Sequence, residues 1–572
     1  MAVLGDLSAE LIILILTHVP FRDVFSFQLT SRSFHTVISE STELQYHILL
    51  QTSGMLDNCN SSLPLRTRYE MLREREKSWL LLQPRFTRRI SVGHSAVVPY
   101  ELLGDVYMVS DGSKATISTF TLPSDAGDPV SSSRKLHVGD FDQGRIIDFA
   151  VAPEQDLLVL VTSDSDTPTG ALNLQIHCIQ RTTYKRHPLS VAGPISLSFD
   201  VPCSCAHAAV AGDLIALTFQ SGDSEDDQVF LLNWKRSTVL AEMKSPTHLH
   251  GNAIFISRDI LLVPNYTGLS YTGPSIQLWR IPEPSTKRVV LTTPNLTLNL
   301  PAYHPEVEVH EFLCRNSDNS SSQRPFYSDP DQSIVLFQLF TLSEPEPSSI
   351  ELVFFVHRKV FLELLSAHEN QPSSDSVVDH NSMHVLPWLS WGPPNTRFFH
   401  PTWYDQSSHT DWIVTAYGQR YVFLDLRYRT QEGTPVVVFD FNENTVKRVR
   451  NALEKAQTQD PPSLDIALLD VSIPTSIKGP ESDGDPALAR QRIGWCWKNR
   501  PGEDSGRNVP WGDQVLSQIF SEHVDGDLPY VMLCSEKLYD FTGTMMDDER
   551  VLGARSGEFH AGVDNLEVLW FG

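Results

Sequence analysis

The first candidates for chemistry are the cysteine and histidine residues of a Cys-Ser-Cys-Ala-His run. Cys203, Cys205 and His207 alternate along the chain, so on a strand they would point to one face, as metal ligands must. Structural zinc sites typically pair their ligands as C-x2–4-C with a second matched pair, and the sequence holds no such pair. We therefore expect no metal ion here and assign these residues to a buried strand.

No motif of a catalytic centre stands out elsewhere. Residues 109–116, VSDGSKAT, resemble the Asp-box turn of propeller glycosidases, but the closing aromatic residue is missing and the motif occurs once. A nucleophile elbow, a phosphate loop and an H-E-x-x-H zinc motif are all absent from the sequence. We therefore expect a protein that is not an enzyme and needs no cofactor.

Tryptophans are the remaining side chains that could bind a partner directly. Residues 388–412 are rich in tryptophan and proline and read as a loop, and residues 495–511 place tryptophans beside a charged loop. Tryptophan on a rigid loop makes an interface hot spot, but most aromatic residues of a β domain pack in its core, so both roles stay open. The predicted substrate contacts are Trp388, Trp391, Trp403, Trp495 and Trp511.

The element that must position these residues is a large all-β region, predicted from residue 84 to residue 572. Short apolar runs alternate there with clusters of Gly, Pro, Asp and Ser, which is typical of strands and turns. Three segments repeat one order, in which an inner strand, a turn at aspartate, a second strand and an outer strand follow one another. The turn residues are Asp156, Asp213 and Asp259, spaced somewhat wider than the period of roughly 40–50 residues of a propeller blade.

This region resembles the WD-repeat-like propellers that follow F-boxes, particularly in fungal F-box proteins. The resemblance is loose, because the G-H and W-D marks are mostly missing, and the nearest matches are Trp234 with Lys235 and Trp279 with Arg280. It implies a β-propeller of seven or eight blades. A pair of β-sandwiches is the alternative fold.

The N-terminal segment is organised differently, because residues 11–16 form an unbroken apolar run, LIILIL. In a helix of about 3.6 residues per turn such a run puts apolar side chains on every side. It is too short to cross a bilayer, which needs about 20 apolar residues. Two further short helices can cover one side, and we expect another protein to cover the rest.

Residues 7–38 match the F-box pattern of L-P-x-E-L-L, then L-P-x-x-D-L, then S-R followed by an aromatic residue and L-I. The departure is Ser8 where the family usually has proline, and serine is itself a favoured helix N-cap. The segment therefore resembles an F-box. The matching residues are Leu7, Glu10, Leu11, Ile12, Ile15, Leu16, Val19, Pro20, Asp23, Val24, Ser31, Arg32, Phe34, Val37 and Ile38.

The resemblance implies that residues 1–45 dock on the adaptor subunit of an SCF-type (cullin-RING) ubiquitin ligase and reach the cullin indirectly, while the propeller binds an unknown protein substrate. The alternative is a propeller scaffold outside the ligase, capped by F-box-like helices. An exposed apolar face would indicate a partner, and a covered one would indicate the cap. The predicted adaptor-binding residues are Leu7, Leu11, Ile12, Ile15, Leu16, Val19, Pro20 and Val24.

Between these parts, residues 46–83 predict a helical linker. Apolar residues from Leu65 to Leu82 fall on one stripe among many charges, and Pro84 ends the pattern. We expect this helix to act as a rigid spacer whose apolar stripe docks on the propeller. A second helix is predicted at residues 443–457, bridging two blades, and mobile inserts at 317–332, 366–382 and 474–487.

Composition narrows the partners and the compartment. The formal net charge of −25 repels phosphate backbones and anionic lipid, so we expect neither nucleic acid nor membrane as a partner. Seven cysteines in 572 residues suit a reducing compartment, and no signal peptide is expected, because no basic region precedes the apolar run. Cytosol or nucleus is the expected location.

Overall fold

The protein is described from a computed structural model. It describes residues 7–95, 98–128, 133–141, 144–163, 172–191, 193–199, 203–221, 228–243, 251–266, 273–283, 288–316, 324–343, 348–370, 384–399, 414–426, 429–457, 493–496, 513–522, 524, 526–556 and 562–572.

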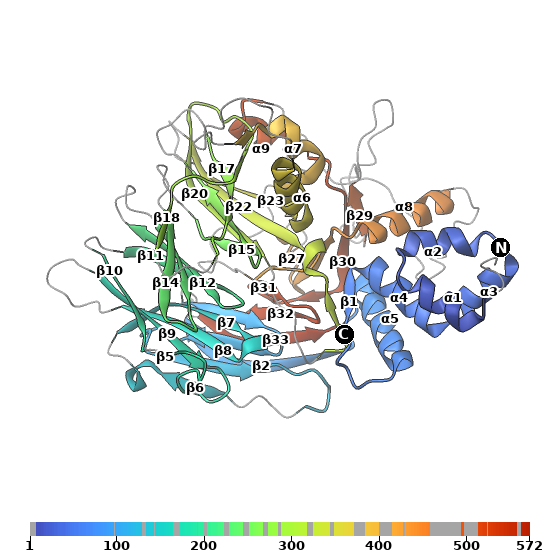
Figure 1. The fold of residues 1–572 in the computed structure, drawn as a ribbon, viewed down its shortest axis with the longest axis horizontal. Coiled ribbons are helices and arrows are strands. Elements are labelled where there is room, and N and C mark those ends of the chain that lie inside the picture. The colour runs from blue at the N-terminus through green and yellow to red at the C-terminus, as the bar shows by residue number, and fades with distance from the viewer. Residues whose placement is uncertain are drawn as a thin grey trace.

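Seven sheets of four or five strands surround one axis, so the large domain is a seven-bladed β-propeller (Figure 1). Blade 1 contains β3 (Tyr100–Leu103), β4 (Val106–Ser110), β5 (Thr116–Thr121) and β6 (Arg134–His137). Blade 2 contains β7 (Arg145–Ala152), β8 (Leu157–Ser163), β9 (Leu172–Gln180) and β10 (Ile195–Phe199). Blade 3 contains β11 (Cys203–Ala211), β12 (Leu214–Ser221), β13 (Gln228–Asn233), β14 (Thr238–Met243) and β18 (Val289–Leu291).

Blades 4 to 7 carry the longer insertions. Blade 4 contains β15 (Ile254–Ser257), β16 (Ile260–Asn265), β17 (Ser275–Arg280), β19 (Leu296–Asn299) and β24 (Val385–Leu386). Blade 5 contains β20 (Val307–Asn316), β22 (Ile334–Ser343), β23 (Ser348–His357) and β25 (Thr396–Phe399). Blade 6 contains β26 (Ala416–Tyr417), β27 (Arg420–Leu424), β28 (Thr434–Asp440), β29 (Ile493–Cys496) and β30 (Tyr530–Tyr539). Blade 7 contains β31 (Gly543–Met546), β32 (Arg550–Arg555), β33 (Gly562–Trp570) and β2 (Phe86–Ser95).

Blade 7 closes the ring with strands from both ends of the domain. Strand β2 pairs antiparallel with β33, from Phe86 opposite Trp570 to Ser95 opposite Gly562. Such closure leaves no open sheet edge between the first and last blades. It also brings the residues after β33 next to the helix that precedes β2.

Blade strands are apolar on both faces because neighbouring blades cover both. Every residue of β8 is buried, and Phe399 of blade 5 stacks on Phe439 of blade 6 with ring centroids 4.7 Å apart. The three-strand order expected from the sequence is confirmed in blades 2, 3 and 4. In blade 2, Asp156 takes a left-handed conformation at the turn, and its carboxylate accepts the Thr182 N–H at 2.9 Å.

Helices form the N-terminal part of the chain, which extends from one side of the propeller (Figure 1). They are α1 (Ala9–Leu16), α2 (Phe21–Gln28), α3 (Arg32–Glu40), α4 (Thr42–Ser53) and α5 (Leu65–Leu81). Ser31 caps α3 by accepting the Phe34 N–H at 3.2 Å. Ser8 precedes α1 in an extended conformation but makes no capping hydrogen bond, so the expected capping chemistry is not used there.

The linker includes a strand that sequence patterns did not indicate. Strand β1 (Met55–Asp57) pairs antiparallel with β21 (Phe326–Ser328), an insertion in blade 5. Part of the 317–332 insert is thus an ordered strand and not a mobile loop. In the second predicted insert, residues 366–369 belong to helix α6 (Arg358–Glu369). The rest of the predicted mobile inserts, 317–323, 371–382 and 474–487, lies outside the described residues. Gly54 joins α4 to β1 with a φ of +66°, and a Cβ there would lie 2.1 Å from Gln419 Nε2.

Among the described residues of the propeller, four helices are inserted: α6 (Arg358–Glu369), α7 (Trp388–Asn395), α8 (Glu443–Gln457) and α9 (Asp513–Ile519). Helix α8 has the predicted bounds. It packs on β30 of blade 6 and on α4, and its Glu443 pairs with Lys359 of α6, the helix inserted in blade 5, so it contacts two blades. The region after residue 388, expected to be a loop, begins with α7 and continues into β25.

Candidate adaptor-docking face and its junction with the propeller

The first three helices share a small core with α4. Ile12, Leu16, Val24 and Ile38 are buried against Leu44 and Ile48. The phenyl rings of Phe27 and Phe34 pack alongside, with centroids 4.1 Å apart. This core covers one side of α1, as expected from the apolar run at residues 11–16.

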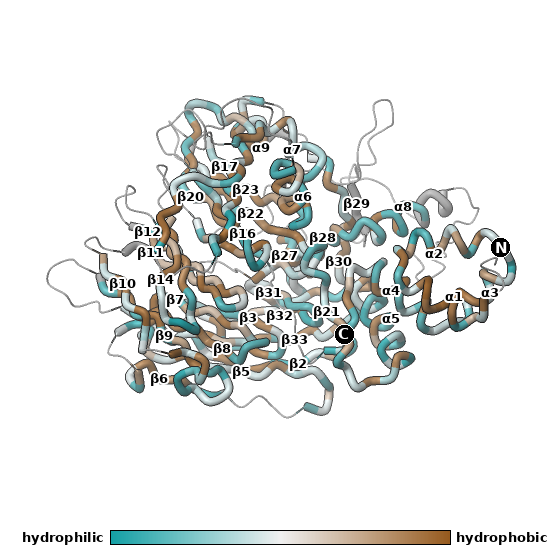
Figure 2. The backbone as a smooth tube through the Cα atoms, viewed as in Figure 1, coloured by the Kyte–Doolittle hydropathy of each residue, from teal (hydrophilic) through white to brown (hydrophobic). Residues whose placement is uncertain are grey.

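The other side of α1 stays exposed. Leu11 and Ile15 are 48% and 43% exposed, and Leu14, Phe25 and Leu29 are also exposed. Figure 2 shows α1 as one of the most apolar stretches of the helical part. We call these five residues the docking face. Leaving such side chains in water forgoes about 1.5–3 kcal/mol each relative to full burial, so this face is suited to a protein partner.

The predicted adaptor-binding residues therefore divide by position. Leu11, Ile15 and Pro20 are exposed, Leu7 and Val19 are half-buried, and Ile12, Leu16 and Val24 are in the helical core. Contact of these residues with an adaptor stays a prediction. Sequence reasoning missed Leu14, Phe25 and Leu29, although the spacing of four residues between Phe25 of α2 and Leu29, its C-cap residue, is a signal for one shared helix face.

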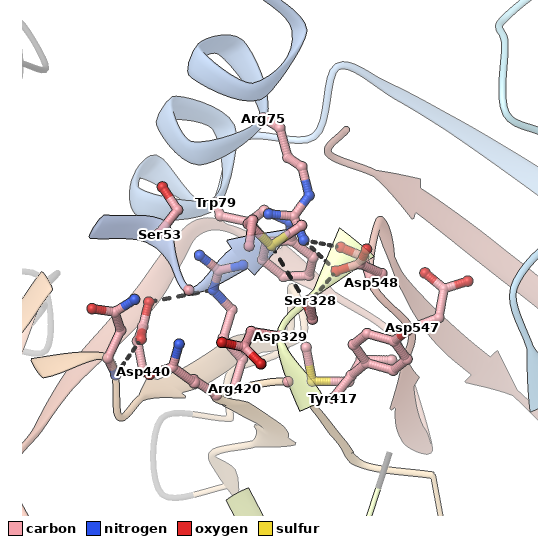
Figure 3. Close-up of a pocket in the computed structure, with 16 residues that line it drawn as sticks. Ser53, Arg75, Trp79, Ser328, Asp329, Tyr417, Arg420, Asp440, Asp547 and Asp548 are labelled. Atoms are coloured by element: carbon pink, nitrogen blue, oxygen red, sulfur yellow. Dashed lines mark hydrogen bonds and ion pairs between the residues drawn. The ribbon is translucent and has the colours of Figure 1, made fainter. Parts of the chain in front are cut away.

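The linker helix α5 is fixed to the propeller by aromatic stacking and by a buried ion pair. Figure 3 shows the ion pair between Arg75 and Asp548, with Trp79 beside it. Trp79 stacks on Phe571 with ring centroids 4.2 Å apart. The Arg75 guanidinium donates to the Asp548 carbonyl at 2.7 Å and pairs with the Asp548 carboxylate at 2.5 Å. Both Arg75 and Asp548 are buried.

Asp548 is the centre of this polar junction. Burial by itself raises its pKa, but Arg75 and Arg324 outweigh burial, and the pKa lies below the ordinary value of an aspartate. Ser328 also donates its hydroxyl to Asp548 at 2.9 Å. The Asp548 carboxylate is therefore charged in the folded protein and joins α5, blade 5 and blade 7.

A second ion-pair group links α5 to blade 6. Arg420 donates to Glu76 at 2.8 Å and to Asp440 at 3.3 Å. Its guanidinium also lies 5.0 Å from the centre of the Trp79 ring, a cation–π distance. The small polar cavity between these side chains is lined by both ion-pair groups (Figure 3).

Helix α8 supports the F-box part from the other side. Asn442, just before α8, donates to the Thr52 carbonyl at the end of α4 at 3.1 Å. Glu443 lies 3.9 Å from Arg22 of α2 and 3.4 Å from Lys359 of α6. Blades 5, 6 and 7 thus all hold the helical part, so the docking face has a fixed position relative to the propeller.

The predicted substrate-contact tryptophans fall into two groups. Trp388 and Trp391 are buried in the largest core cluster, where Trp391 donates its indole N–H to the Asn299 carbonyl at 3.0 Å. Their burial supports the core role that the sequence left open. Trp403 and Trp511 lie outside the described residues, and Trp495 lies in β29, whose side chains are also outside them.

Polar side chains of the inner strands approach one another near the propeller axis. Burial raises the pKa of Glu101 in β3 to about 8, with Asp148 raising it further and Arg315 opposing. Burial likewise raises the pKa of Asp148 in β7 to about 7. The pKa of His207 in β11 is lowered to about 4 by burial and by Arg315. These groups come from blades 1, 2, 3 and 5.

Within the described part of the chain, no group of three or more His, Cys, Asp or Glu side chains is placed to hold a metal ion. No described helix is both long enough and apolar enough to cross a membrane.

Comparison with known proteins identifies the N-terminal part. Residues 4–45 match the model of the F-box domain, in agreement with the resemblance found in the sequence. No curated protein matches the sequence. The chain therefore has an F-box domain at residues 4–45 and a seven-bladed propeller after its helical linker.

Solved structures resemble the chain only distantly. Dipeptidyl peptidase 4 of Porphyromonas gingivalis is 12% identical, covering 61% of this chain and 50% of its own, with a TM-score of 0.26. The major allergen Mala s 1 of Malassezia sympodialis is 11% identical over 47% and 77%, with a TM-score of 0.25. The AfRom2 CNH domain is 11% identical over 48% and 86%, with a TM-score of 0.24. The chain spans half the length of the peptidase, and these likenesses do not bear on function.

An F-box followed by a propeller is consistent with a substrate receptor of an SCF-type ubiquitin ligase, and F-box proteins are typically non-catalytic adaptors. The likeness to fungal F-box proteins stays a prediction.

Proposed function

We propose that the protein is the substrate-recognition subunit of an SCF-type (cullin-RING) E3 ubiquitin ligase, working in the cytosol or nucleus. The observation that carries this proposal is the exposed docking face on an F-box domain. Ile12 is only 5% exposed beside Leu11 at 48%, so α1 already fills its own core and still presents a second apolar side. A helical cap on the propeller would have that side covered.

The receptor contributes no bond chemistry in this proposal. The docking face binds the adaptor, the propeller binds a substrate protein, and the fixed junction holds one at a set distance and direction from the other. Ubiquitin transfer then gains from proximity, because the bound substrate is present at high effective concentration. The buried ion pairs and the Trp79 stack favour this role over a flexible tether.

The experiment is co-purification of the full chain with the adaptor and the cullin. A Leu11→Asp/Ile15→Asp variant changes exposed residues only, and it should lower adaptor affinity at least 100-fold, because about 1.5–3 kcal/mol of burial is lost at each site. Leu389→Asp, at a residue 71% exposed on α7, is the matched control and should bind as wild type does.

Both variants should melt at the wild-type temperature. If the wild-type chain fails to bind the adaptor, or if the double variant binds it normally, the receptor assignment is wrong. The protein would then be a propeller scaffold outside the ligase.

A further inference from the structure

The outer turn of blade 2, between β9 and β10, is held rigidly by hydrogen bonds. Thr182 donates both its N–H and its hydroxyl to Asp156, at 2.9 and 2.6 Å. His187 is buried, donates Nε2–H to the Gln155 carbonyl at 3.0 Å, and accepts the Leu189 N–H at Nδ1 at 3.2 Å. Its ring also packs edge-on against Trp234 at 4.7 Å. These hydrogen bonds thus hold residues 182–189 of the turn against the β7–β8 turn.

This rigid turn nevertheless presents two large apolar side chains to solvent. Leu189 is 56% exposed and Val191 is 78% exposed. The Val191 N–H donates to the Lys235 carbonyl at 3.0 Å, which ties the turn to the β13–β14 turn of blade 3. The hydrogen bonds therefore fix both side chains in their exposed positions.

Three exposed cations without a described counter-ion lie on this turn or beside its hydrogen bond to blade 3. The Arg186 guanidinium donates to the Ser190 carbonyl at 2.6 Å, between Leu189 and Val191. Lys185 is exposed next to Arg186 in the chain. Arg236 is exposed in the β13–β14 turn, directly after Lys235. Among the described residues, none of these three cations forms an ion pair.

Two described carboxylates near the turn are already engaged. Asp156 is held by Thr182 and lies 4.0 Å from Arg181, while Asp213 pairs with Lys235 at 2.6 Å. In a chain of net charge −25, a local surface with two apolar residues and three cations that pair with no described carboxylate is distinct. We call Lys185, Arg186, Leu189, Val191 and Arg236 the blade 2 patch.

We propose that the blade 2 patch is a docking site for a segment of a partner protein in which leucine- or valine-sized residues alternate with aspartate or glutamate. The apolar side chains of the segment would cover Leu189 and Val191, and its carboxylates would meet Lys185, Arg186 and Arg236. The identification of that partner as the ubiquitylation substrate rests on the proposed function. The binding of such a segment at the patch is independent of the proposed function.

The patch and the docking face can be occupied together. Blade 2 lies on the side of the propeller away from α1 (Figure 1). A protein bound at the patch therefore leaves the docking face free for the adaptor.

The test is fluorescence anisotropy of the full chain at low salt with a labelled Glu-Leu-Glu-Leu-Glu peptide as the probe. Control peptides replace both leucines with alanine, the glutamates with glutamine, or the glutamates with phosphoserine. The wild-type chain should bind the Glu/Leu probe at least tenfold more tightly than the first two controls and no more than tenfold more weakly than the phosphopeptide. Affinity should fall as salt is raised.

Two variants locate the binding on the chain. Leu189→Ser/Val191→Ser and Lys185→Glu/Arg236→Glu should each weaken binding of the probe at least tenfold, with unchanged melting temperatures. Leu389→Ser is the matched control for an exposed leucine and should bind normally, as should Leu11→Asp/Ile15→Asp, which tests the adaptor site alone.

The proposal is overturned if the wild-type chain binds all peptides within threefold, if either patch variant binds as wild type, or if the phosphopeptide binds more than tenfold more tightly than the Glu/Leu probe. The two proposals are tested separately, because the Leu11→Asp/Ile15→Asp variant should lose adaptor binding and keep peptide binding. Failure of the peptide experiment would therefore leave the proposed ligase role untouched.

Discussion

The indole ring of Trp79, near the end of the linker helix α5, stacks on the phenyl ring of Phe571 just after the last strand, at 4.2 Å and an interplanar angle of 15°. Both side chains are almost completely buried. The stack joins the helix that carries the F-box to the strand pair that closes the propeller.

Replacing Trp79 with alanine should therefore destabilise the junction. Removing a buried tryptophan typically costs about 3–5 kcal/mol, and the stacking partner Phe571 would lose its contact. Urea unfolding should show this loss, and limited proteolysis should release the helical part sooner. Tyr69→Ala, a less buried position on the same helix, is the control. An unchanged proteolysis pattern in Trp79→Ala would mean that the stack does not hold the junction.

Asp548→Asn tests the buried ion pair with Arg75. Removing one partner of a buried pair typically costs about 3–5 kcal/mol, because the other charge stays buried without compensation. The folded-state pKa of Asp548 is lowered, so its stabilising contribution is present above the unfolded value of about 3.9 and is lost as pH falls through the folded value.

The difference in unfolding free energy between wild type and Asp548→Asn should accordingly be large at pH 7 and shrink as the pH is lowered below about 4. Denaturant titrations at a series of pH values measure it. A difference that is constant across this range would show that the charge on Asp548 does not stabilise the junction.

Glu101 should produce a pH dependence of opposite sign. Its folded-state pKa of about 8 lies above the unfolded value of about 4.3, so its contribution to stability is complete below pH 4 and is lost as pH rises to about 8. Glu101→Gln removes this titration. The melting temperature of the variant should fall less than that of wild type between pH 5 and pH 8, and an equal fall in both would contradict the raised pKa.

The two sides of α1 should respond differently to the same substitution. Ile12→Asp places a charge in the core of the three short helices and should unfold the F-box locally, with loss of helical circular dichroism and rapid proteolysis of the N-terminal part. Leu14→Asp changes a residue of the docking face and should leave helicity intact. If Ile12→Asp keeps its helices, the side of α1 assigned to the core is wrong.

Local patterns determined a large part of this protein. The F-box follows from residues close together in sequence: an apolar run too short for a membrane, a proline turn, and the Ser31, Arg32 and Phe34 of the family pattern. The blade order followed from aspartate turns between short apolar strands, because antiparallel neighbours are joined by short local turns. The bounds of α8 followed from its helical periodicity, which is also a local pattern.

Tertiary structure decided which of these residues are available to a partner. On α1 every side is apolar, so sequence alone could not separate the buried Ile12 from the exposed Leu11; only the packing of α3 and α4 does so. The tryptophans at 388 and 391 read as loop residues because of their prolines, yet packing between blades buries them. The pairing of Arg75 with Asp548, 473 residues apart, depends on ring closure, and so does the stacking of Trp79 on Phe571. No local pattern encodes such contacts, because they form only when the whole propeller has folded.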